Sequence, residues 1–341
     1  MARGRVVKLD RGYPLVKVEG LDPFRCEHAT ALVKGRRIRS VIGDFVDVEL
    51  PCGHDNGIIR SIEARRSQFV RRDPAERTSS QVLAANFERV VVVEPAVDLN
   101  VKRLERELVL AHEAGVQVSV LLTKADLVSS ARELEAVERL ARDLAGSSVE
   151  VRSMSTAHPE TVDAVRAWFP EGTLGVLLGK SGVGKSSLVN LLVGQQVMET
   201  GAVREGDGKG RHTTVSRAIV SIPGAGDVVD MPGVRGLGLW DADNGIEAAF
   251  PDVAAFSSEC RFRDCKHEAE PGCAVLAAVQ RGDLASVRVE SYRALKDELD
   301  QMRRRREEAR QMRGEKASDQ RDSRKGAFRA RSRYNRGSAR R

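Results

Sequence analysis

A glycine-rich segment from Gly179 to Ser186 holds the residues of this chain that are best suited to chemistry. It reads GKSGVGKS and lies between an apolar segment, 174–178, and a helical pattern that begins at Lys185. Glycines allow backbone N–H groups to turn toward phosphate oxygens, a lysine can reach the β and γ phosphates, and a serine hydroxyl can hold Mg²⁺. A glycine turn that happens to precede Lys-Ser is the alternative, which the flanking strand and helix disfavour. The expected phosphate-binding contacts come from Gly179, Lys180, Ser181, Gly182, Val183, Gly184, Lys185, Ser186 and Ser187.

A second motif, Thr123-Lys124-Ala125-Asp126, follows an apolar strand pattern and indicates which base is bound. The carboxylate of Asp126 can accept hydrogen bonds from both N1–H and the exocyclic amine of guanine, whereas adenine offers no such pair of donors. The stem of Lys124 can lie along the base plane, and Thr123 stands where asparagine is normal in this motif. A loop of this kind also arises by chance, but beside a phosphate-binding loop it predicts guanine.

A third motif, Asp230-Met-Pro-Gly, follows the short strand pattern DVVD. Asp230 at the end of that strand can hold the shell of a Mg²⁺ ion through water, while the N–H of Gly233 can face the γ-phosphate. A turn made only for Pro-Gly geometry is the alternative. Upstream, a glycine-rich stretch ends in His212, Thr213 and Thr214, and such a segment can be ordered by Mg²⁺ and the γ-phosphate through a threonine.

The residue after Gly233 is Val234, where many GTPases place the glutamine that orients the attacking water. We therefore expect slow intrinsic turnover and a catalytic group supplied from elsewhere. His212 is the best internal candidate because it lies beside the two threonines, and a loop histidine without a catalytic role is the alternative.

The order of these motifs along the chain is unusual. In common small GTPases the base-reading motif follows the phosphate-binding loop, whereas here Asp126 precedes Gly179. The order predicts a circularly permuted domain, which can keep the same site because function depends on where residues lie in space.

Three cysteines and one histidine follow in the pattern Cys260-x₄-Cys265-x-His267-x₅-Cys273. Three sulfurs and one imidazole can make a closed tetrahedral Zn²⁺ site, which suits a structural role and leaves no open position for catalysis. Unrelated buried cysteines are the alternative, but a segment with so few apolar residues needs a metal to hold it together. We expect one structural zinc per chain.

Length and composition set broad limits. The 341 residues suffice for two or three domains. The N-terminus has no apolar run after its basic residues, no window is apolar for long enough to cross a bilayer, and five cysteines do not resemble a secreted disulfide framework. We expect a soluble cytoplasmic protein with no membrane partner.

The net charge of +7 is unevenly distributed. Residues 301–341 hold 16 Lys and Arg against 5 Asp and Glu, a net charge of +11. Residues 1–77 carry +5, which leaves −9 for residues 78–300. An acidic middle between two basic ends predicts that the ends meet a polyanion such as RNA.

The expected elements fall into three groups. Residues 4–77 hold five short strand patterns, RVVKL, YPLVKV, ATALVKG, FVDVEL and GIIRSIE, which favour a β-barrel, and the charged run 65–77 is a plausible linker. From residue 80 strands and helices alternate, which predicts a mainly parallel sheet covered by helices. A helical apolar stripe follows the cysteines, at Val289, Tyr292, Leu295, Leu299 and Met302.

Taken together, these motifs and their order resemble the ribosome small-subunit-dependent GTPase A (RsgA) family from about residue 4 to residue 300. The resemblance rests on TKAD, GKSGVGKS, RHTT and DMPG in that order, followed by CRFRDCKHEAEPGC. It implies a monomeric factor in late maturation of the small ribosomal subunit that binds ribosomal RNA and hydrolyses GTP when the subunit stimulates it. It also implies that Ser155 and Thr156 belong to the nucleotide site.

The expected fold is a multidomain α/β protein. An OB-type barrel that binds RNA occupies 1–77, a circularly permuted P-loop GTPase domain 78–248, and a zinc-binding helical module 249–313. The Arg-rich remainder, 314–341, has almost nothing to bury, and we expect it to be disordered and to contact RNA.

Three alternatives stay open at this point. A GTP-gated RNA-binding module with no required turnover is conceivable because of Val234. An ATP-dependent RNA remodeller would require Asp126 to be accidental. A second metal could be held by two Cys-x-His patterns in the barrel, although a strand would bury the first cysteine. These patterns comprise Cys26, His28, Cys52 and His54.

Overall fold

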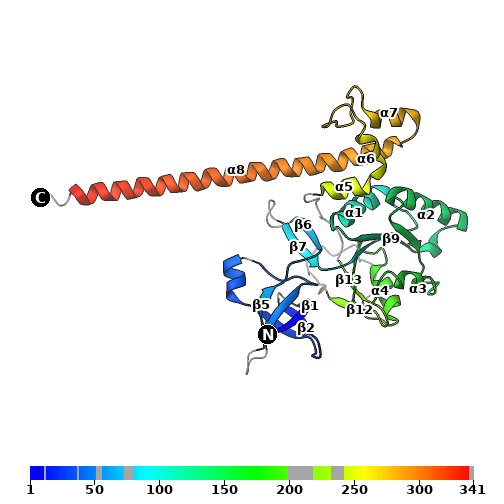
Figure 1. Ribbon diagram of the computed structural model, residues 1–341, viewed down its shortest axis with the longest axis horizontal. Coiled ribbons are helices and arrows are strands. Elements are labelled where there is room, and N and C mark those ends of the chain that lie inside the picture. The colour runs from blue at the N-terminus through cyan, green and yellow to red at the C-terminus, as the bar shows by residue number, and fades with distance from the viewer. Residues whose placement is uncertain are drawn as a thin grey trace, which may run out of the picture.

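The structure is a computed structural model of the 341-residue chain. It describes residues 1–10, 13–36, 38–50, 56–72, 80–198, 218–231 and 242–337. Figure 1 shows a barrel at the N-terminus, a helix-covered sheet in the middle and a long C-terminal helix that leaves the body.

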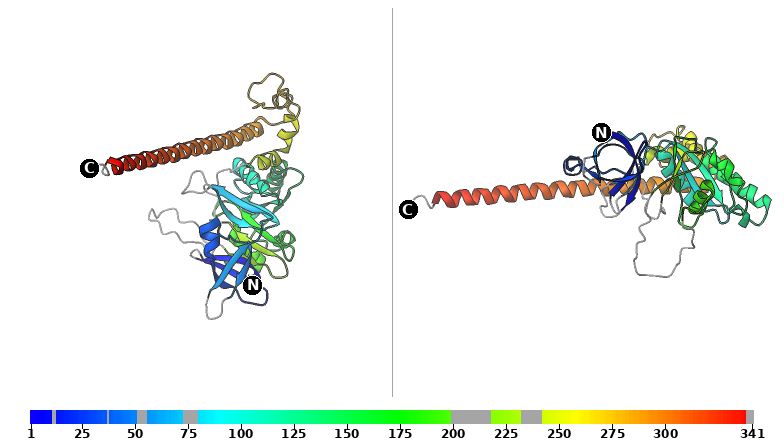
Figure 2. Two further views of the ribbon diagram at one scale, coloured as in Figure 1. Left: turned by 60° about the vertical axis from the view of Figure 1, so that its left-hand side comes forward. Right: turned by 90° about the horizontal axis from the view of Figure 1, so that it is seen from below.

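The N-terminal part is a closed five-stranded barrel in the order β1-β2-β3-β5-β4. Its strands are β1 (Ala2–Asp10), β2 (Tyr13–Val18), β3 (Phe24–His28), β4 (Phe45–Glu49) and β5 (Gly57–Ile62). Alternate residues point inward, so that Val6, Val16, Val46 and Ile59 are fully buried in one small core. The barrel is seen nearly end-on in the right panel of Figure 2.

One of the five expected barrel strands was wrong. The segment 29–35 lies largely in a single π-helical turn, Ala31–Arg36, and the third strand is β3 instead. The local residues explain this, because Ala, Leu, Lys and Arg favour helix, while β3 pairs in parallel with β5 to close the barrel.

A separate two-stranded sheet follows the barrel. It consists of β6 (Gln68–Arg72) and β7 (Ser80–Ala85), which pair antiparallel. The charged run that we interpreted as a linker therefore contains a strand. Phe69 and Leu83 on this sheet are buried in the core of the neighbouring domain, which is why the segment is ordered as a strand despite its charges.

The central domain contains a six-stranded sheet in the order β10-β9-β8-β11-β13-β12, parallel except for β12. The strands are β8 (Arg89–Pro95), β9 (Gln117–Thr123), β10 (Glu150–Ser153), β11 (Leu174–Leu178), β12 (Ile219–Ser221) and β13 (Asp227–Asp230). Four α-helices accompany it: α1 (Val101–Glu113), α2 (Ala131–Ala145), α3 (Thr161–Arg166) and α4 (Lys185–Val193). The predicted alternation of strands and helices is confirmed.

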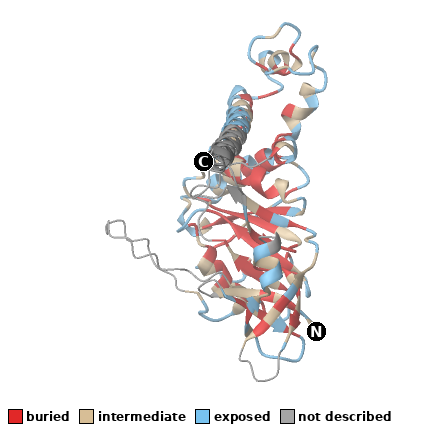
Figure 3. Ribbon diagram, turned by 90° about the vertical axis from the view of Figure 1, so that its left-hand side faces the viewer, coloured by how far each residue is buried: buried red, intermediate tan, exposed pale blue. Residues whose placement is uncertain are grey.

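The central strands are apolar on both faces because helices cover both sides of the sheet. Along β8, Val90 and Val92 face the core formed with α1 and α2, whereas Val91 and Val93 face the core formed with α3 and α4. Figure 3 shows this continuous buried layer through the sheet.

The C-terminal part is helical, with α5 (Asp243–Ala249), α6 (Pro251–Ser257), α7 (Ala274–Arg281) and α8 (Ser286–Gly337). The predicted apolar stripe of α8 is confirmed, since all five of its residues are buried against the central domain. Beyond that stripe α8 extends to Gly337, and the disorder expected from 314 onward stays a prediction. No helix in the described part of the chain is long and apolar enough to span a bilayer.

Asn86, which lies between β7 and β8, joins the barrel to the central domain. Its side chain donates to the carbonyl of Gly43 at 3.1 Å and accepts from the N–H of Arg66 at 2.9 Å, and its own carbonyl accepts from Arg5 at 2.8 Å. Asn86 is 1% exposed and has a left-handed backbone, φ +54°. These bonds fix barrel, connecting segment and sheet at one buried point.

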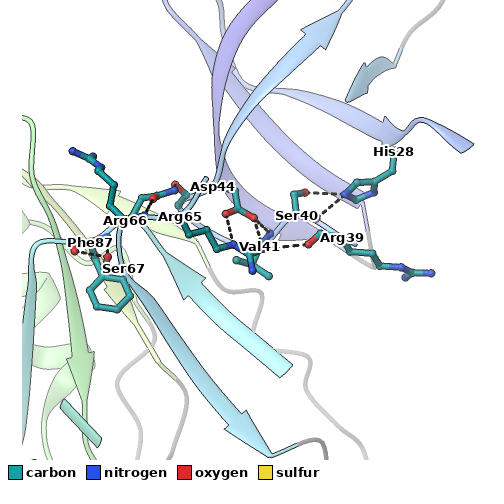
Figure 4. A network of polar contacts seen from close by, with 11 residues as sticks. His28, Arg39, Ser40, Val41, Asp44, Arg65, Arg66, Ser67 and Phe87 are labelled. Carbon is teal, nitrogen blue, oxygen red and sulfur yellow. Dashed lines mark hydrogen bonds and ion pairs between the residues drawn. The ribbon is translucent and has the colours of Figure 1, made fainter. Parts of the chain in front are cut away.

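A run of polar contacts continues from this junction into the barrel (Figure 4). The guanidinium of Arg65 donates to both carboxylate oxygens of the fully buried Asp44, at 2.8 and 2.9 Å. Asp44 also accepts from the N–H of Val41, and the next residue back, Ser40, donates its N–H to Nε2 of His28 at 2.9 Å. This network orders the segment between the π-helical turn and β4.

Candidate nucleotide site and metal cluster

The phosphate-binding loop lies at the carboxyl edge of the parallel sheet, between β11 and α4. Strand β13 pairs in parallel with β11, and Leu177 is the partner of Asp230 in that register. Asp230 therefore ends its strand directly beside the loop. The base-reading motif ends β9, which lies on the other side of β8 at the same edge. Ligands of open α/β sheets bind at this edge.

Three glycines shape the loop in ways that other residues could not. Gly182 and Gly184 have φ values of +84° and +106°, which turn successive N–H groups inward. A Cβ atom on Gly179 would lie 2.4 Å from the carbonyl oxygen of Val93, so the loop can pack against β8 only with glycine there.

Lys185 and Asp230 form the charged centre of the site. The ammonium of Lys185, which is 5% exposed as a residue, donates to the carbonyls of Gly179 at 2.7 Å and Lys180 at 3.2 Å. Its nitrogen lies 3.8 Å from Oδ1 of Asp230, and this oxygen is buried with no hydrogen-bond partner among the described residues. Burial raises the pKa of Asp230, and the nearby Lys185 opposes that rise. A buried carboxylate oxygen without a partner fits the shell of a hydrated divalent cation.

Thr123 connects the base-reading motif to the phosphate loop. Its hydroxyl donates to the carbonyl of Val183 in that loop and lies 3.3 Å from the carbonyl of Glu94 at the end of β8. The residue is 2% exposed, so its side chain faces the phosphate loop. The hydroxyl that threonine retains thus ties two separate loops of the site together.

Asp126 is held by Ser155, which follows β10. The hydroxyl of Ser155 donates to Oδ1 of Asp126 and accepts from the N–H of Ala157 at 2.9 Å. Lys124 has a left-handed backbone, φ +56°, and its side chain is partly exposed beside Asp126. Thr156 is exposed in the loop after Ser155. The structure thus places both predicted base-site segments at adjacent strand ends.

A buried acidic pair behind the site was missed by the sequence reasoning. Arg103 of α1 donates to both carboxylate oxygens of Glu94, which is fully buried at the end of β8. Glu107, one turn further along α1, is 2% exposed, and burial together with the charge of Glu94 raises its pKa to about 8. No motif marks this pair, because the residues belong to a strand and a helix with an ordinary apolar pattern.

The second predicted site is assembled in the loops between α6 and α7. One ligand atom each from Cys260, Cys265, His267 and Cys273 lies within 4.8 Å of all the others. Nδ1 of His267 lies 3.4 Å from Sγ of Cys273, while Nε2 lies 3.1 Å from the hydroxyl of Ser257. The hydroxyl thus engages the ring nitrogen that points away from the sulfurs. This donor set and its outer partner fit a tetrahedral metal site.

Several predicted residues lie outside the described part of the chain. They are His212, Thr213, Thr214, Gly233, Val234, Cys52 and His54. Of the speculative second metal set, Cys26 is buried inside the barrel, and His28 binds Ser40 through Nε2. Both therefore have roles within the barrel.

Comparisons with known proteins agree with this geometry. A family model described as RsgA GTPase matches residues 62–240. The chain is 46% identical over 297 residues to the small ribosomal subunit biogenesis GTPase RsgA of Streptomyces avermitilis, which covers 86% of this chain and 78% of that protein. It is 40% identical over 256 residues to RsgA 2 of Vibrio parahaemolyticus, covering 74% and 69% respectively.

Two solved structures share the fold. YjeQ from Thermotoga maritima aligns with a TM-score of 0.65 at 24% identity, covering 87% of this chain and 98% of that one. YloQ, described as a circularly permuted GTPase, aligns with a TM-score of 0.64 at 24% identity, covering 88% and 96%.

Proposed function

The chain belongs to the RsgA GTPase family, and from this premise we propose that residues 179–186 bind the phosphates of GTP, with Mg²⁺ held near Ser186 and Asp230. The chain is a GTPase of small ribosomal subunit biogenesis. The assignment of these residues rests on the parallel register of β11 and β13, because that register places Asp230 beside the loop that ends in Lys185. Mg²⁺, when bound, neutralises charge on the β and γ phosphates.

The base is read by Asp126, whose carboxylate is oriented by Ser155. That carboxylate accepts from N1–H and the exocyclic amine of guanine, Lys124 lies along the base plane, and Thr156 lines the same edge. A substitution tests this directly. Asp126→Asn exchanges an acceptor for an amide donor, so it should weaken GTP binding and favour xanthosine triphosphate, which presents a carbonyl in place of the amine. Unchanged preference for GTP would contradict the assignment.

Several residues of the chain act during hydrolysis. Lys185 exchanges the carbonyls of Gly179 and Lys180 for phosphate oxygens, and Asp230 gains a partner for its unpaired oxygen. Turnover by the isolated chain is slow because Val234 replaces the water-orienting glutamine. His212 supplies the missing group, with Thr213, Thr214 and the N–H of Gly233 ordering around the γ-phosphate.

Phosphate release, measured with and without purified small ribosomal subunits, tests this function. We expect little release from the chain alone and a large stimulation by subunits. Lys185→Ala should abolish both, whereas His212→Ala should remove the stimulated rate and leave GTP binding intact. Equal rates with and without subunits would favour a GTP-gated RNA-binding module that does not need turnover.

The Cys₃His cluster holds one structural zinc, with Cys260, Cys265 and Cys273 as thiolates and His267 bound through Nδ1. The contact between Ser257 and Nε2 supports this choice of ring nitrogen. Four protein ligands complete a closed site, so this metal takes no part in hydrolysis. The bound zinc holds the loops between α6 and α7 in one arrangement.

The chain acts as a cytoplasmic monomer in late maturation of the small subunit. The barrel of residues 1–77 and the module of residues 249–313 contact ribosomal RNA. Hydrolysis of GTP in the domain at 78–248 causes both of them to leave the RNA. Subunit binding should be tight with a non-hydrolysable GTP analogue and weak with GDP. Equal affinities in the two nucleotide states would contradict release by hydrolysis.

The basic tail, residues 314–341, adds a second RNA contact by neutralising phosphates. Its deletion should lower affinity for subunits and flatten the dependence of affinity on salt concentration. An unchanged salt slope would show that the tail does not contact RNA.

A further inference from the structure

The loop between the first two cluster cysteines, residues 261–264, presents an aromatic side chain to solvent. Phe262 is 41% exposed, and its loop belongs to the segment between α6 and α7, at the outer end of the molecule away from the barrel (Figures 1 and 2). Single exposed apolar residues are common on proteins. The surroundings of Phe262 distinguish it from such a residue.

The loop has little freedom to fold Phe262 inward. Cys260 and Cys265 bracket it as members of the ligand cluster, and the carbonyl of Phe262 accepts from the N–H of Cys265 at 3.4 Å. Zinc bound to the cluster would fix both ends of the loop. The backbone of the loop is thus held at both ends while the ring is exposed.

Two arginines flank Phe262 in the sequence. The guanidinium of Arg261 lies 5.5 Å from the centre of the Phe262 ring, and neither Arg261 nor Arg263 forms an ion pair with a described residue. Gly272 supports this arrangement, since a Cβ atom there would come within 3.1 Å of Cβ of Arg261, and its carbonyl accepts from the N–H of Arg261. The stem of Arg261 thus packs over a glycine that cannot be enlarged without displacing it.

Two nearby carboxylates are engaged elsewhere. Glu270 accepts the N–H groups of Lys266, Glu268 and Ala269, at 2.8, 2.8 and 3.1 Å, and Glu268 pairs with Arg293 of α8 at 3.0 Å. The loop itself contains two arginines and one carboxylate, that of Asp264. An exposed aromatic ring beside unpaired guanidinium groups is the combination that stacks unpaired nucleobases while holding their phosphates.

We propose that Phe262, with Arg261 and Arg263, is a stacking site for an unpaired nucleotide of the small-subunit RNA. The inference rests on the proposed function, because it names a contact through which the zinc module holds the subunit. An unpaired nucleotide fits better than a duplex, since a base inside a helix offers no free face to the ring. Phe262 supplies the stacking surface and Arg263 a phosphate contact.

The test uses the zinc-loaded full chain with a non-hydrolysable GTP analogue and measures its binding to purified small subunits, to protein-free small-subunit RNA and to a short oligouridylate. An RNA duplex of the same length as the oligouridylate is the comparison ligand, whose binding should not change. Phe262→Ala should weaken all three by about tenfold, and Phe262→Trp should restore binding because it keeps an aromatic face. Leu140→Ala is the matched control, since Leu140 is also 41% exposed but lies on α2, and it should change nothing. Zinc content shows that each variant retains a folded module.

Salt dependence separates stacking from charge. Arg263→Ala should reduce the slope of log affinity against log salt by about 0.7, the contribution of one phosphate contact to a single strand. Phe262→Ala should leave that slope unchanged.

Three outcomes would overturn the inference. The first is that Phe262→Ala binds all three ligands with wild-type affinity, and the second is that it loses as much affinity for duplex RNA of the same length as for the oligouridylate. The third is that it loses affinity only for intact subunits, which would indicate a ribosomal protein as the partner. A wild-type chain that fails to bind subunits at all would instead overturn the proposed function.

Discussion

Nζ of Lys185 lies 3.8 Å from Oδ1 of Asp230, and the same ammonium donates to two carbonyls of the phosphate loop. The lysine is therefore held close to the carboxylate by the loop, without a hydrogen bond between the two charges. This leaves Asp230 with a buried oxygen that has no partner among the described residues. In the function we propose, these two groups exchange their present contacts for phosphate and cation.

Mg²⁺-dependent GTP binding should weaken as pH falls, and it should do so at a higher pH than an ordinary aspartate would cause. Burial raises the pKa of Asp230, so the carboxylate is protonated at a higher pH than an ordinary aspartate and loses the charge that holds the cation shell. Titration of nucleotide affinity against pH, at fixed Mg²⁺, measures this. Asp230→Asn should bind GTP weakly at every pH. If this variant kept the wild-type dependence of GTP affinity on pH, Asp230 would be excluded as the cause of that dependence.

Folding stability should fall as pH rises from about 5 to about 8. The pKa of Glu107 is raised to about 8, so over this range the folded chain holds a proton that the unfolded chain has released. Glu107→Gln mimics the protonated form and should flatten this part of the profile. Thermal denaturation at several pH values measures the effect, and an identical profile in the variant would show that another group is responsible.

Thr123→Val should lower GTP affinity by about five- to tenfold, the expected effect of losing one buried hydrogen bond. The substitution keeps the shape of the side chain and removes the hydroxyl that reaches Val183 and Glu94. Thr123→Ser retains the hydroxyl and should bind GTP nearly as the wild type does. Calorimetric titration with GTP compares the three, and equal affinity in the valine variant would assign the hydroxyl no part in binding.

Asn86→Ala should lower the melting temperature by several degrees. It leaves the buried carbonyl of Gly43 without its partner, at a cost of about 1–3 kcal/mol, and it also removes the acceptor of the part-buried N–H of Arg66. It also places alanine in a left-handed conformation. Calorimetry of the whole chain measures the change, with Ser61→Ala on the barrel as a partly exposed control. A melting curve like that of the wild type would show that the domains are held together elsewhere.

Ser257→Ala should reduce zinc affinity by about tenfold or more, because the hydroxyl fixes the ring of His267. Competition with a metal-binding dye measures this. Ser258→Ala, whose hydroxyl binds the carbonyl of Ala255, is the neighbouring control. Equal loss in both variants would point to the helix end and not to the histidine.

The grouping of the candidate nucleotide-site segments at one sheet edge could be predicted because each segment is local in sequence. The phosphate loop, the base motif and Asp230 each follow a strand with a clear apolar pattern, and parallel strands bring their carboxyl ends to one edge. The cluster cysteines lie within one short segment, so their spacing alone indicates a metal site.

Contacts between distant segments could not be predicted in the same way. The hydroxyl of Thr123 reaches a carbonyl sixty positions further along the chain, and Asn86 binds residues of the barrel that precede it by more than forty. The π-helical turn at Ala31–Arg36 was mistaken for a strand because its valine and leucine fit both patterns. Burial of Glu107 depends on the packing of α1 and leaves no trace in composition.

Helix α8 turns a small movement at its base into a large one at its tip. Asp243, the first residue of α5, pairs with Lys296 and Arg303 of α8, and α5 begins where the chain returns from the segment that follows Asp230. Beyond the Arg303 contact the helix runs on to Gly337, roughly 51 Å at about 1.5 Å per residue. A tilt of about 5° at the Asp243 contacts would therefore carry the far end about 4 Å. The contacts of Asp243 with α8 therefore set the direction of the whole free part of the helix.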